Sequence, residues 1–409
     1  MQRPLLVQTA GIAIVGGGMA GITLALGLVN RGISCKIHER GHIFSEIDAG
    51  VTFASNSICA MEACDLSVST AFKAVATHGL CKPNCANMFE RRKELYFDFS
   101  GGYHDNGSEP SEVLFSLYNW EGSNSDIAEF RKRVVDESDD QGLITLYFTD
   151  DTTATAEAVI EADDVKSHVR RFILGFENHE IHACYSYKCA YRGPIPMENA
   201  IAELGEDMAA NTEMHLGLDG HVITLPVDRG ETMNVVAFTR SKEGSIDPHR
   251  STRAATEKDT PSELAGWSKN VTPILSLLNE YVDTWAIFDM LDYPASTYAK
   301  ERKVLIGDVA HVASPHHGSG AGFGIEDIAV LAEMLAAPAV KTHKGLRALF
   351  QAFDLCRSPR TQWHIAGSRP NGRPDEWQAE GVGVDIEKIA TEAHERSEKI
   401  AGRYQINDC

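Results

Sequence analysis

The stretch GIAIVGGGMAGITLALGLVNRGISCKIHER, from Gly11 to Arg40, decides the fold class of this chain. The apolar run Ile12–Val15 predicts a short buried strand, and the residues from Ile22 to Val29 supply the apolar face of a helix. A glycine-containing turn ends that helix, and residues 34–38 predict a second strand. A strand–helix–strand unit of this length indicates an α/β fold with a parallel sheet.

The turn between the first strand and the helix has the spacing G-x-G-x-x-G, with Gly16, Gly18 and Gly21. In dinucleotide-binding units these glycines make the tight turn, admit a pyrophosphate and let the helix pack on the strand. The helix N-terminus then points its positive end at the phosphates. Glu39 ends the second strand, where a carboxylate accepts hydrogen bonds from a ribose. The stretch therefore predicts nucleotide binding rather than an ordinary glycine-rich turn.

The composition narrows the classes of partner. The chain has 409 residues, a formal net charge of -20 and 43% hydrophobic residues. An acidic balance argues against nucleic acid and anionic membranes, since both bind basic patches. The apolar stretch Leu5–Val29 is interrupted by glycines, so it predicts neither a signal peptide nor a membrane span. We expect a cytoplasmic protein, either a monomer or a homodimer.

The nine cysteines are scattered, and the closest pair is Cys81 and Cys85. No second Cys/His pair at zinc spacing accompanies them, so no metal site is expected. Their mostly apolar neighbours favour reduced thiols inside the protein.

The middle of the chain changes to the alternating pattern of antiparallel strands. Residues 141–160 predict a hairpin around residues 149–151, and residues 181–240 contain several similar runs. Asp219-Gly220 is a strong hairpin turn. An amphipathic helix is expected from about Asp385 onward.

A second glycine-rich stretch, KVLIGDVAHVASPHHGSGAGFGIEDIAVLAEML, runs from Lys303 to Leu335. Asp308 follows a short apolar run, and Gly318, Gly320 and Gly322 precede an apolar helical pattern. This predicts a strand ending in a carboxylate, then bare backbone at a helix N-terminus that we expect from about Ile325.

Three motifs in order resemble those of the single-component FAD-dependent aromatic hydroxylases, the class of salicylate hydroxylase and para-hydroxybenzoate hydroxylase. The first is the G-x-G-x-x-G turn with Glu39. The second is EADDVKSHVR (residues 161–170), similar to the family's GADGxxSxxR. The third is GDVAHVASPHHGSGAGFGIED (residues 307–327), similar to GDAAHxxxPxxGxGxxxxxED. The resemblance covers nearly the whole chain and is greatest to the fungal salicylate hydroxylase-like and polyketide-pathway branch.

The resemblance implies a Rossmann-type FAD-binding domain with an inserted antiparallel β-sheet substrate domain and a C-terminal helical segment, similar to para-hydroxybenzoate hydroxylase. The FAD-binding domain would be discontinuous, with residues 1–80, 140–178 and 295–350. The substrate domain would hold residues 81–139 and 179–294, and the C-terminal helices residues 351–409.

The resemblance also implies the chemistry. NADPH or NADH would reduce FAD, which would react with O2 to a C4a-hydroperoxide that hydroxylates a phenolic or aromatic substrate, salicylate-like or polyketide. Two alternatives stay open. The same chemistry can give epoxidation or rearrangement of an indole or alkene, or the chain is a degenerate flavin-fold protein with weak or no FAD binding.

The same resemblance implies which residues contact FAD. Asp308 would contact ribose or ribityl hydroxyls, and the helix after the second glycine stretch would point its positive end at the flavin N1–C2=O edge. The implied cofactor-binding residues are Gly16, Gly18, Gly21, Glu39, Arg40, Gly50, Asp163, Gly307, Asp308, Gly318, Gly320, Ala321 and Gly322.

Arg192 and His317 are the candidate catalytic residues. Arg192 lies in an apolar strand pattern, where a guanidinium needs a partner such as a phenolate or a substrate carboxylate; the alternative is a structural salt bridge. His316 and His317 precede the glycines, and either is a base, a substrate-docking group or a loop residue that bonds backbone. Relatives often carry a tyrosine near Leu225, and a leucine cannot orient a phenolate.

The chain departs from the family pattern in two places. Glu161 and Asp164 replace both glycines of the GADG motif, and their charges would repel a nearby pyrophosphate. A helix with a flavin-contacting arginine is also missing, because residues 115–130 lead almost directly into a strand. Both departures put tight FAD binding in question.

Overall fold

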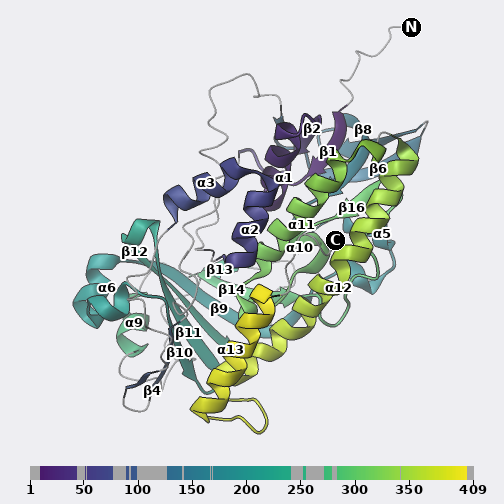
Figure 1. Ribbon diagram of the computed structural model, residues 1–409. Coiled ribbons are helices and arrows are strands. Elements are labelled where there is room, and N and C mark those ends of the chain that lie inside the picture. The colour runs from purple at the N-terminus through teal and green to yellow at the C-terminus, as the bar shows by residue number, and fades with distance from the viewer. Residues whose placement is uncertain are drawn as a thin grey trace.

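The computed structural model describes residues 10–43, 51, 53–76, 89–91, 94–98, 127–140, 142–165, 167, 169–240, 252–254, 271–278, 283–340 and 342–402. Two sheets organise these residues, one on each side of the molecule in Figure 1. The first sheet contains β1 (Ala10–Val15), β2 (Cys35–His38), β5 (Ala128–Glu129), β6 (Val134–Asp140), β7 (Leu143–Phe148), β8 (Thr153–Glu161), β15 (Ala299–Lys300) and β16 (Lys303–Leu305).

The centre of the first sheet is parallel, as the opening stretch predicts. The strand order is β15-β16-β8-β1-β2-β5, and β1 pairs in parallel with both β2 and β8. β7 pairs antiparallel with β8, and β6 with β7, so the predicted hairpin is confirmed. The carboxyl ends of β1, β8 and β16 therefore meet at one edge, where ligands bind in open α/β sheets.

Helices cover one face of this sheet and build its main core. Ile12 and Ile14 of β1 pack against Leu24 and Leu28. α2 and α11 run side by side next to the sheet (Figure 1). The helices of this layer are α1 (Met19–Asn30), α2 (Ser55–Cys64), α3 (Leu66–Val75), α11 (Gly320–Ala336) and α12 (His343–Asp375). On the other face, Ala13 and Val15 pack against the β6–β7 hairpin and the start of α5 (Arg170–Leu174).

The second sheet is antiparallel and has the order β13-β14-β9-β12-β11-β10-β4-β3. Asp219 adopts φ 63° in the turn that joins β10 to β11, as the Asp-Gly signal predicts. Its strands are β3 (Phe89–Arg91), β4 (Glu94–Asp98), β9 (Cys184–Pro196), β10 (Glu213–Gly217), β11 (Gly220–Val227), β12 (Thr232–Arg240), β13 (Thr252–Ala254) and β14 (Asp283–Asp289).

The two faces of the second sheet have different neighbours. Tyr191, Val222 and Val235 point to one face and pack against residues of α6 (Met197–Leu204), α7 (Glu206–Ala209) and α9 (Val271–Leu277). Because side chains alternate along a strand, Lys188 and Arg192 of β9 point to the opposite face.

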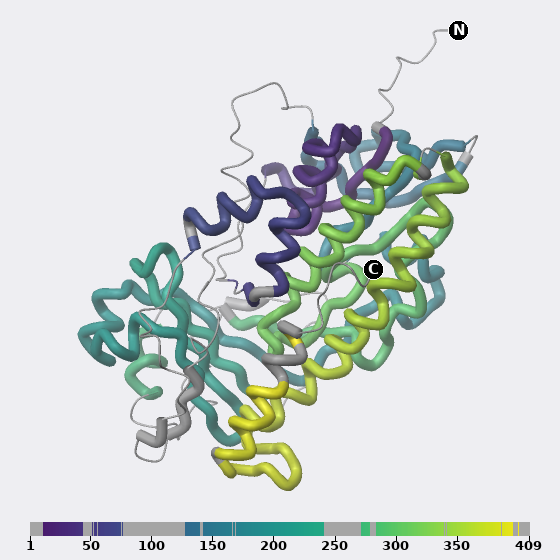
Figure 2. The backbone as a smooth tube through the Cα atoms, in the orientation of Figure 1, coloured from purple at the N-terminus to yellow at the C-terminus, as the bar shows by residue number. Residues whose placement is uncertain are grey.

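The C-terminal helices connect the two sheets. α12 leaves α11 and runs toward the second sheet, where α13 (Ile386–Gly402) follows it (Figure 2). Ile389 of α13 packs on Met214 and Leu216 of β10. The amphipathic helix expected from about Asp385 is thus confirmed.

The strand pairing differs from one of the expected residue ranges. Residues 81–139 were expected in the substrate domain, yet β5 and β6 pair within the first sheet, so residues 128–139 belong there. The short strand β5 extends β2 by only two pairs, a signal too brief for periodicity to show. α12 begins at His343 and so spans the expected boundary between residues 350 and 351.

Five thiols are reduced, as expected: those of Cys35, Cys59, Cys64, Cys184 and Cys189. Cys356 of α12 is disulfide-bonded, so the prediction of reduced thiols is wrong there. Among the described residues, no helix combines the length and apolar character that a membrane crossing requires.

Candidate active site

The turn between β1 and α1 shows why its glycines are needed. Gly16 has φ 104°, and a Cβ there would lie 2.4 Å from the carbonyl oxygen of Ala162. A Cβ on Gly21 would lie 2.0 Å from the oxygen of Gly16, so helix and strand can only pack at this distance with glycine. At Gly18 a Cβ would meet nothing within 4 Å. Space is therefore open in front of the α1 N-terminus, at the position that the fingerprint assigns to a pyrophosphate.

Glu39, which follows β2, connects this turn to the end of β2 through hydrogen bonds. Its carboxylate accepts a hydrogen bond of 2.6 Å from the Gly17 N–H and another of 2.6 Å from the Gly41 N–H. Each carboxylate oxygen has a further lone pair, so both bonds leave capacity for a ribose hydroxyl. Arg40 is exposed, and Gly50 lies outside the described residues.

The altered GADG segment follows β8 at the same edge. Both carboxylate oxygens of Glu161 are buried without a hydrogen-bond partner among the described residues. Burial, then the charge of Asp163, raises the pKa of Glu161 well above its usual value, which favours the protonated, uncharged form. Asp164 is exposed and adopts φ 76°, a left-handed conformation that favours glycine. Its carboxylate accepts a 2.6 Å bond from the Val165 N–H, which supports that strained turn.

Asp163 and Asp308 follow β8 and β16 at the same sheet edge, and both carboxyl groups have raised pKa values. Burial raises the pKa of Asp163 to about 6, against the opposing effects of Ser167 and Arg40. Asp163 Oδ1 has no hydrogen-bond partner among the described residues. Asp308 begins α10 (Asp308–His311); its side chain is exposed, yet the protein around it and then the charge of Asp164 raise its pKa to about 6.

A buried ionic network holds the Gly307–Asp308 turn. Gly307 has φ 63°, and its N–H donates a 3.0 Å bond to Asp327 Oδ2. Asp327 also pairs with His311 at 2.6 Å and with Arg357 Nε at 2.7 Å. The His311 ring thus ties the short helix that begins at Asp308 to Asp327 of α11. The network therefore fixes the backbone before Asp308 from both α11 and α12.

The second glycine stretch divides into two parts. Gly318 is left-handed at φ 60° and ends the 3-10 turn η3 (Pro315–His317). α11 begins at Gly320, five residues before the expected Ile325, and a Cβ on Gly320 would meet nothing within 4 Å. A Cβ on Gly322 would lie 2.1 Å from Ser57 Oγ. The space at the α11 N-terminus is thus open at Gly320, beside the half-buried Ala321, whereas Gly322 lets α11 pack on α2.

Arg192 and Trp285 lie together on the face of the second sheet opposite α6 and α9. The Arg192 guanidinium lies 4.3 Å from the Trp285 ring centroid, a cation–π contact. Leu225 of β11 is buried and, by strand alternation, shares this face. Tyr191 points to the other face and packs in the core.

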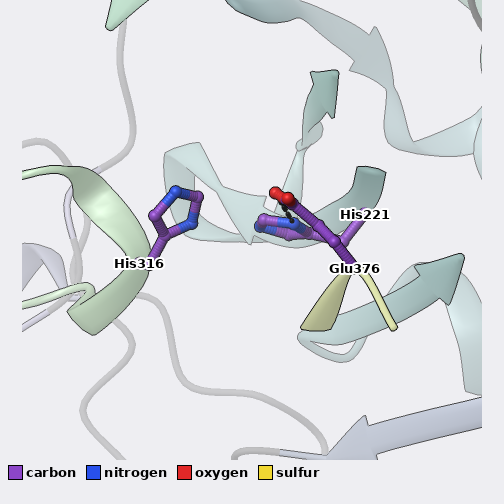
Figure 3. Close-up of side chains that lie close together, drawn as sticks. All are labelled: His221, His316 and Glu376. Carbon is purple, nitrogen blue, oxygen red and sulfur yellow. Dashed lines mark ion pairs between the residues drawn. The ribbon is translucent and has the colours of Figure 1, made fainter. Parts of the chain in front are cut away.

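His317 and His316 turn in different directions. His317 Nδ1 lies 2.9 Å from His364 Nδ1 of α12, and its ring stacks on Trp363 at 5.7 Å between centroids. His316 reaches instead toward His221 of β11 and Glu376, which follows α12 (Figure 3). Lys188 of β9 bonds Glu376 at 2.6 Å and lies 3.2 Å from His316 Nε2.

Sequence reasoning missed Lys188, His221 and Glu376. A charge in the apolar run around Lys188 carried the same signal that selected Arg192. His221 and Glu376 had none, because their role depends on α12 folding back onto the second sheet.

A family model described as an FAD binding domain matches residues 9–365 of this chain. The chain belongs to this FAD-binding family. It is 38% identical to an FAD-dependent monooxygenase of Aspergillus niger, over 95% of this chain and 93% of the relative. It is 38% identical to the FAD-dependent monooxygenase pigN of Monascus ruber, over 97% and 94% of the two chains. Among solved structures, a salicylate hydroxylase in a substrate complex superposes with a TM-score of 0.79 at 29% identity, covering 98% of this chain and 97% of the other.

This FAD-dependent monooxygenase of the salicylate hydroxylase type has a site that fits its cofactor. Two helix N-termini, at Gly18 and Gly320, have open space in front and no side-chain cap from the N-cap residue. At Glu161, part of the altered GADG segment, the raised pKa favours the uncharged carboxyl, which lowers the expected repulsion of a pyrophosphate. The segment with the missing arginine, residues 115–130, lies mostly outside the described residues.

Proposed function

We propose that this monooxygenase uses NADH or NADPH and O2 to hydroxylate a phenolic or aromatic substrate that carries a negative charge. The observation that supports this most is the Arg192–Trp285 pair. A planar cation stacked on an indole presents its N–H donors to a carboxylate or phenolate and adds an aromatic surface nearby. The relatives above, which include monooxygenases and a salicylate hydroxylase, support the same class.

The position of Arg192 on β9 supports a substrate site beside the proposed flavin site. Lys188 contacts His316 in η3, two residues before Gly318. Arg192 lies four residues further along the same face of β9, about 13 Å from Lys188 for an extended strand. A substrate bound at Arg192 would therefore lie on the sheet face that meets the glycine stretch.

The FAD-binding residues would be those at the edge of the first sheet. Gly16, Gly18 and Gly21 would hold the pyrophosphate at α1, and Glu39 and Asp308 would bind hydroxyls of the ribose and ribityl chain. Gly318, Gly320 and Ala321 would lie against the flavin ring at the α11 N-terminus. When bound and reduced, FAD supplies an electrophilic oxygen from O2 at its C4a atom.

The protein's own residues would position the substrate and exclude water. Arg192 would hold the anionic group and favour the phenolate, the more electron-rich form of the ring. Leu225 would offer an apolar contact where relatives often have a tyrosine. This loss of a hydroxyl favours a substrate whose reacting group is set by Arg192, and it keeps epoxidation or rearrangement of an indole or alkene as the second outcome.

The test is the rate of NADH and NADPH oxidation by the FAD-loaded enzyme, with salicylate and a panel of phenols, and with indole as the uncharged probe. We expect at least tenfold stimulation by one or more anionic phenols, with O2 uptake and a product heavier by one oxygen. Stimulation by indole alone would replace the proposal with the second outcome. No stimulation by any aromatic would contradict it.

A further inference from the structure

A buried group of four ionisable side chains joins the second sheet to the turn before Gly318. Its members are Lys188 of β9, His221 of β11, His316 of η3 and Glu376 at the end of α12, and each is at most 8% exposed. Figure 3 shows His316 reaching from its turn toward the other imidazole and the carboxylate. Charged groups are costly to bury, so their mutual contacts determine which of them carries a proton.

Lys188 has the central position in this group. Its ammonium donates a 2.6 Å hydrogen bond to Glu376 Oε1 and lies 3.2 Å from His316 Nε2. His221 Nδ1 lies 3.6 Å from the same carboxylate oxygen, beyond hydrogen-bond length, and its ring stacks on Phe238 at 4.6 Å. Lys188 and Glu376 therefore form the charged pair, and the two imidazoles flank it.

The Lys188 ammonium also contacts two of the three residues that could otherwise bind a metal ion. One ligand atom each from His221, His316 and Glu376 lies within 4.8 Å of the others. Lys188 Nζ already contacts two of these three residues, and a second cation beside it would be repelled. The chain thus supplies its own cation at a place where a metal would otherwise fit.

α12 leaves room for this contact by having glycine at position 372. A Cβ there would lie 2.6 Å from Lys188 Nζ and 2.8 Å from His316 Nε2. The helix therefore approaches the Lys188–His316 contact without a side chain, an observation independent of the hydrogen bonds themselves.

The chemistry of an ammonium fixes the proton on the imidazole. A lysine ammonium has three donors and no acceptor, so His316 Nε2 must accept. The ring proton is then on Nδ1. A positive charge 3.2 Å away also opposes protonation of the ring to an imidazolium.

We propose that Lys188 and Glu376 are positioning residues that hold His316 as a neutral imidazole with its proton on Nδ1. In this state His316 Nε2 accepts from Lys188 and the protonated Nδ1 is buried, so the ring is not available to the site as a base. Lys188 contacts His316 directly, and the other charged or titratable groups around Lys188 are Arg240 from β12 and Asp375 and Glu376 at the end of α12. His221 from β11 packs against the His316 ring. The inference rests on the proposed function only in placing η3 beside the substrate.

The test is the 15N NMR spectrum of the histidine ring nitrogens, recorded on the 15N-histidine-labelled full-length protein between pH 6.5 and 8.5. The His316 signals are assigned by their loss in His316→Asn. We expect a pyrrole-type Nδ1 and a pyridine-type Nε2 at every pH. In Lys188→Met the buried Glu376 loses its partner, so the His316 ring should take up a proton, with its apparent pKa higher by about one pH unit. Lys188→Arg keeps the cation and should keep the wild-type signals.

The double variant Lys188→Met/Glu376→Gln removes both charges, and its His316 ring should be neutral again. A wild-type ring that carries its proton on Nε2, or that is charged at pH 7, would overturn the proposal. So would a Lys188→Met spectrum equal to that of the wild type. If Lys188→Met does not fold, the wild-type and Lys188→Arg spectra still decide. No turnover is measured, so this result and the test of hydroxylation succeed or fail separately.

Discussion

Asp163 shows how a single carboxyl group at the site weakens the apoprotein. Its pKa of about 6 in the folded state, raised by burial, exceeds the value of about 4 expected in the unfolded chain. The folded state therefore binds this proton more tightly than the unfolded state does. The resulting stability is fully present below about pH 4 and is lost as the pH rises through about 6.

Asp163→Asn should accordingly stabilise the apoprotein at pH 7.5, by at most about 3 kcal/mol, and much less at pH 4.5. Urea denaturation of both proteins at the two pH values measures this difference. Glu157→Gln, at an exposed position of β8, is the control. An equal effect of Asp163→Asn at both pH values would show that its proton is not linked to folding.

Arg192 allows a second prediction at the scale of one residue. Arg192→Lys keeps the charge but loses the planar stack on Trp285, and Arg192→Met loses both. For an anionic phenol that stimulates NAD(P)H oxidation, we expect kcat/KM to fall about tenfold in the lysine variant and about a hundredfold in the methionine variant. A KM for the phenol that is unchanged in Arg192→Met would remove Arg192 from the substrate site.

At the scale of an element, the start of α11 allows a prediction, because two nearby glycines have different roles. Gly322 permits helix packing, and Gly320 borders the proposed cofactor space. Gly322→Ala places a methyl group 2.1 Å from Ser57 Oγ and should cost about 1–3 kcal/mol of apoprotein stability. Gly320→Ala meets no protein atom within 4 Å, so apoprotein stability should hold, while FAD affinity should fall because the methyl group enters the cofactor space.

Denaturation of the apoproteins and FAD titration separate these two effects. Ser57→Ala, combined with Gly322→Ala, removes the closest atom and should restore most of the lost stability. A Gly320→Ala variant with full FAD affinity would mean that the cofactor does not approach this part of α11.

The individual elements were predictable where a local signal was strong. The β1–α1–β2 unit, the hairpin at Asp219 and the C-terminal amphipathic helix all follow from periodicity and turn residues within a few positions. The start of α11 was placed five residues late, because Gly320 and Gly322 weaken the helical pattern of its first turn. β5 was missed because a strand of two residues is too short to show an alternating hydrophobic pattern.

The site was predictable only where it lies in the motifs. Glu39, Asp163, Asp308 and the first glycine turn come together at the edge of the first sheet. The contacts that hold them do not appear in the sequence. Asp327 reaches back to Gly307 across 20 residues, and Glu376 reaches Lys188 across 188. Such pairs arise from how α11 and α12 pack, which no local pattern encodes.

At the scale of the whole molecule, α12 is the element that connects the two halves of the site. Near its middle, Arg357 bonds Asp327 behind the Gly307 turn, and Glu376 at its end bonds Lys188 of the second sheet. One helix therefore relates the predicted FAD edge to the predicted substrate face. The central claim is that the open space at the two helix N-termini holds FAD.

The absorption spectrum of the purified protein tests that claim most directly, recorded before and after incubation with excess FAD and desalting. We predict bands near about 370 and 450 nm, where oxidised flavins absorb, at close to one FAD per chain. A folded, colourless protein that retains no added FAD would contradict the account, and would mean that the altered GADG segment at Glu161 and Asp164 has lost the cofactor.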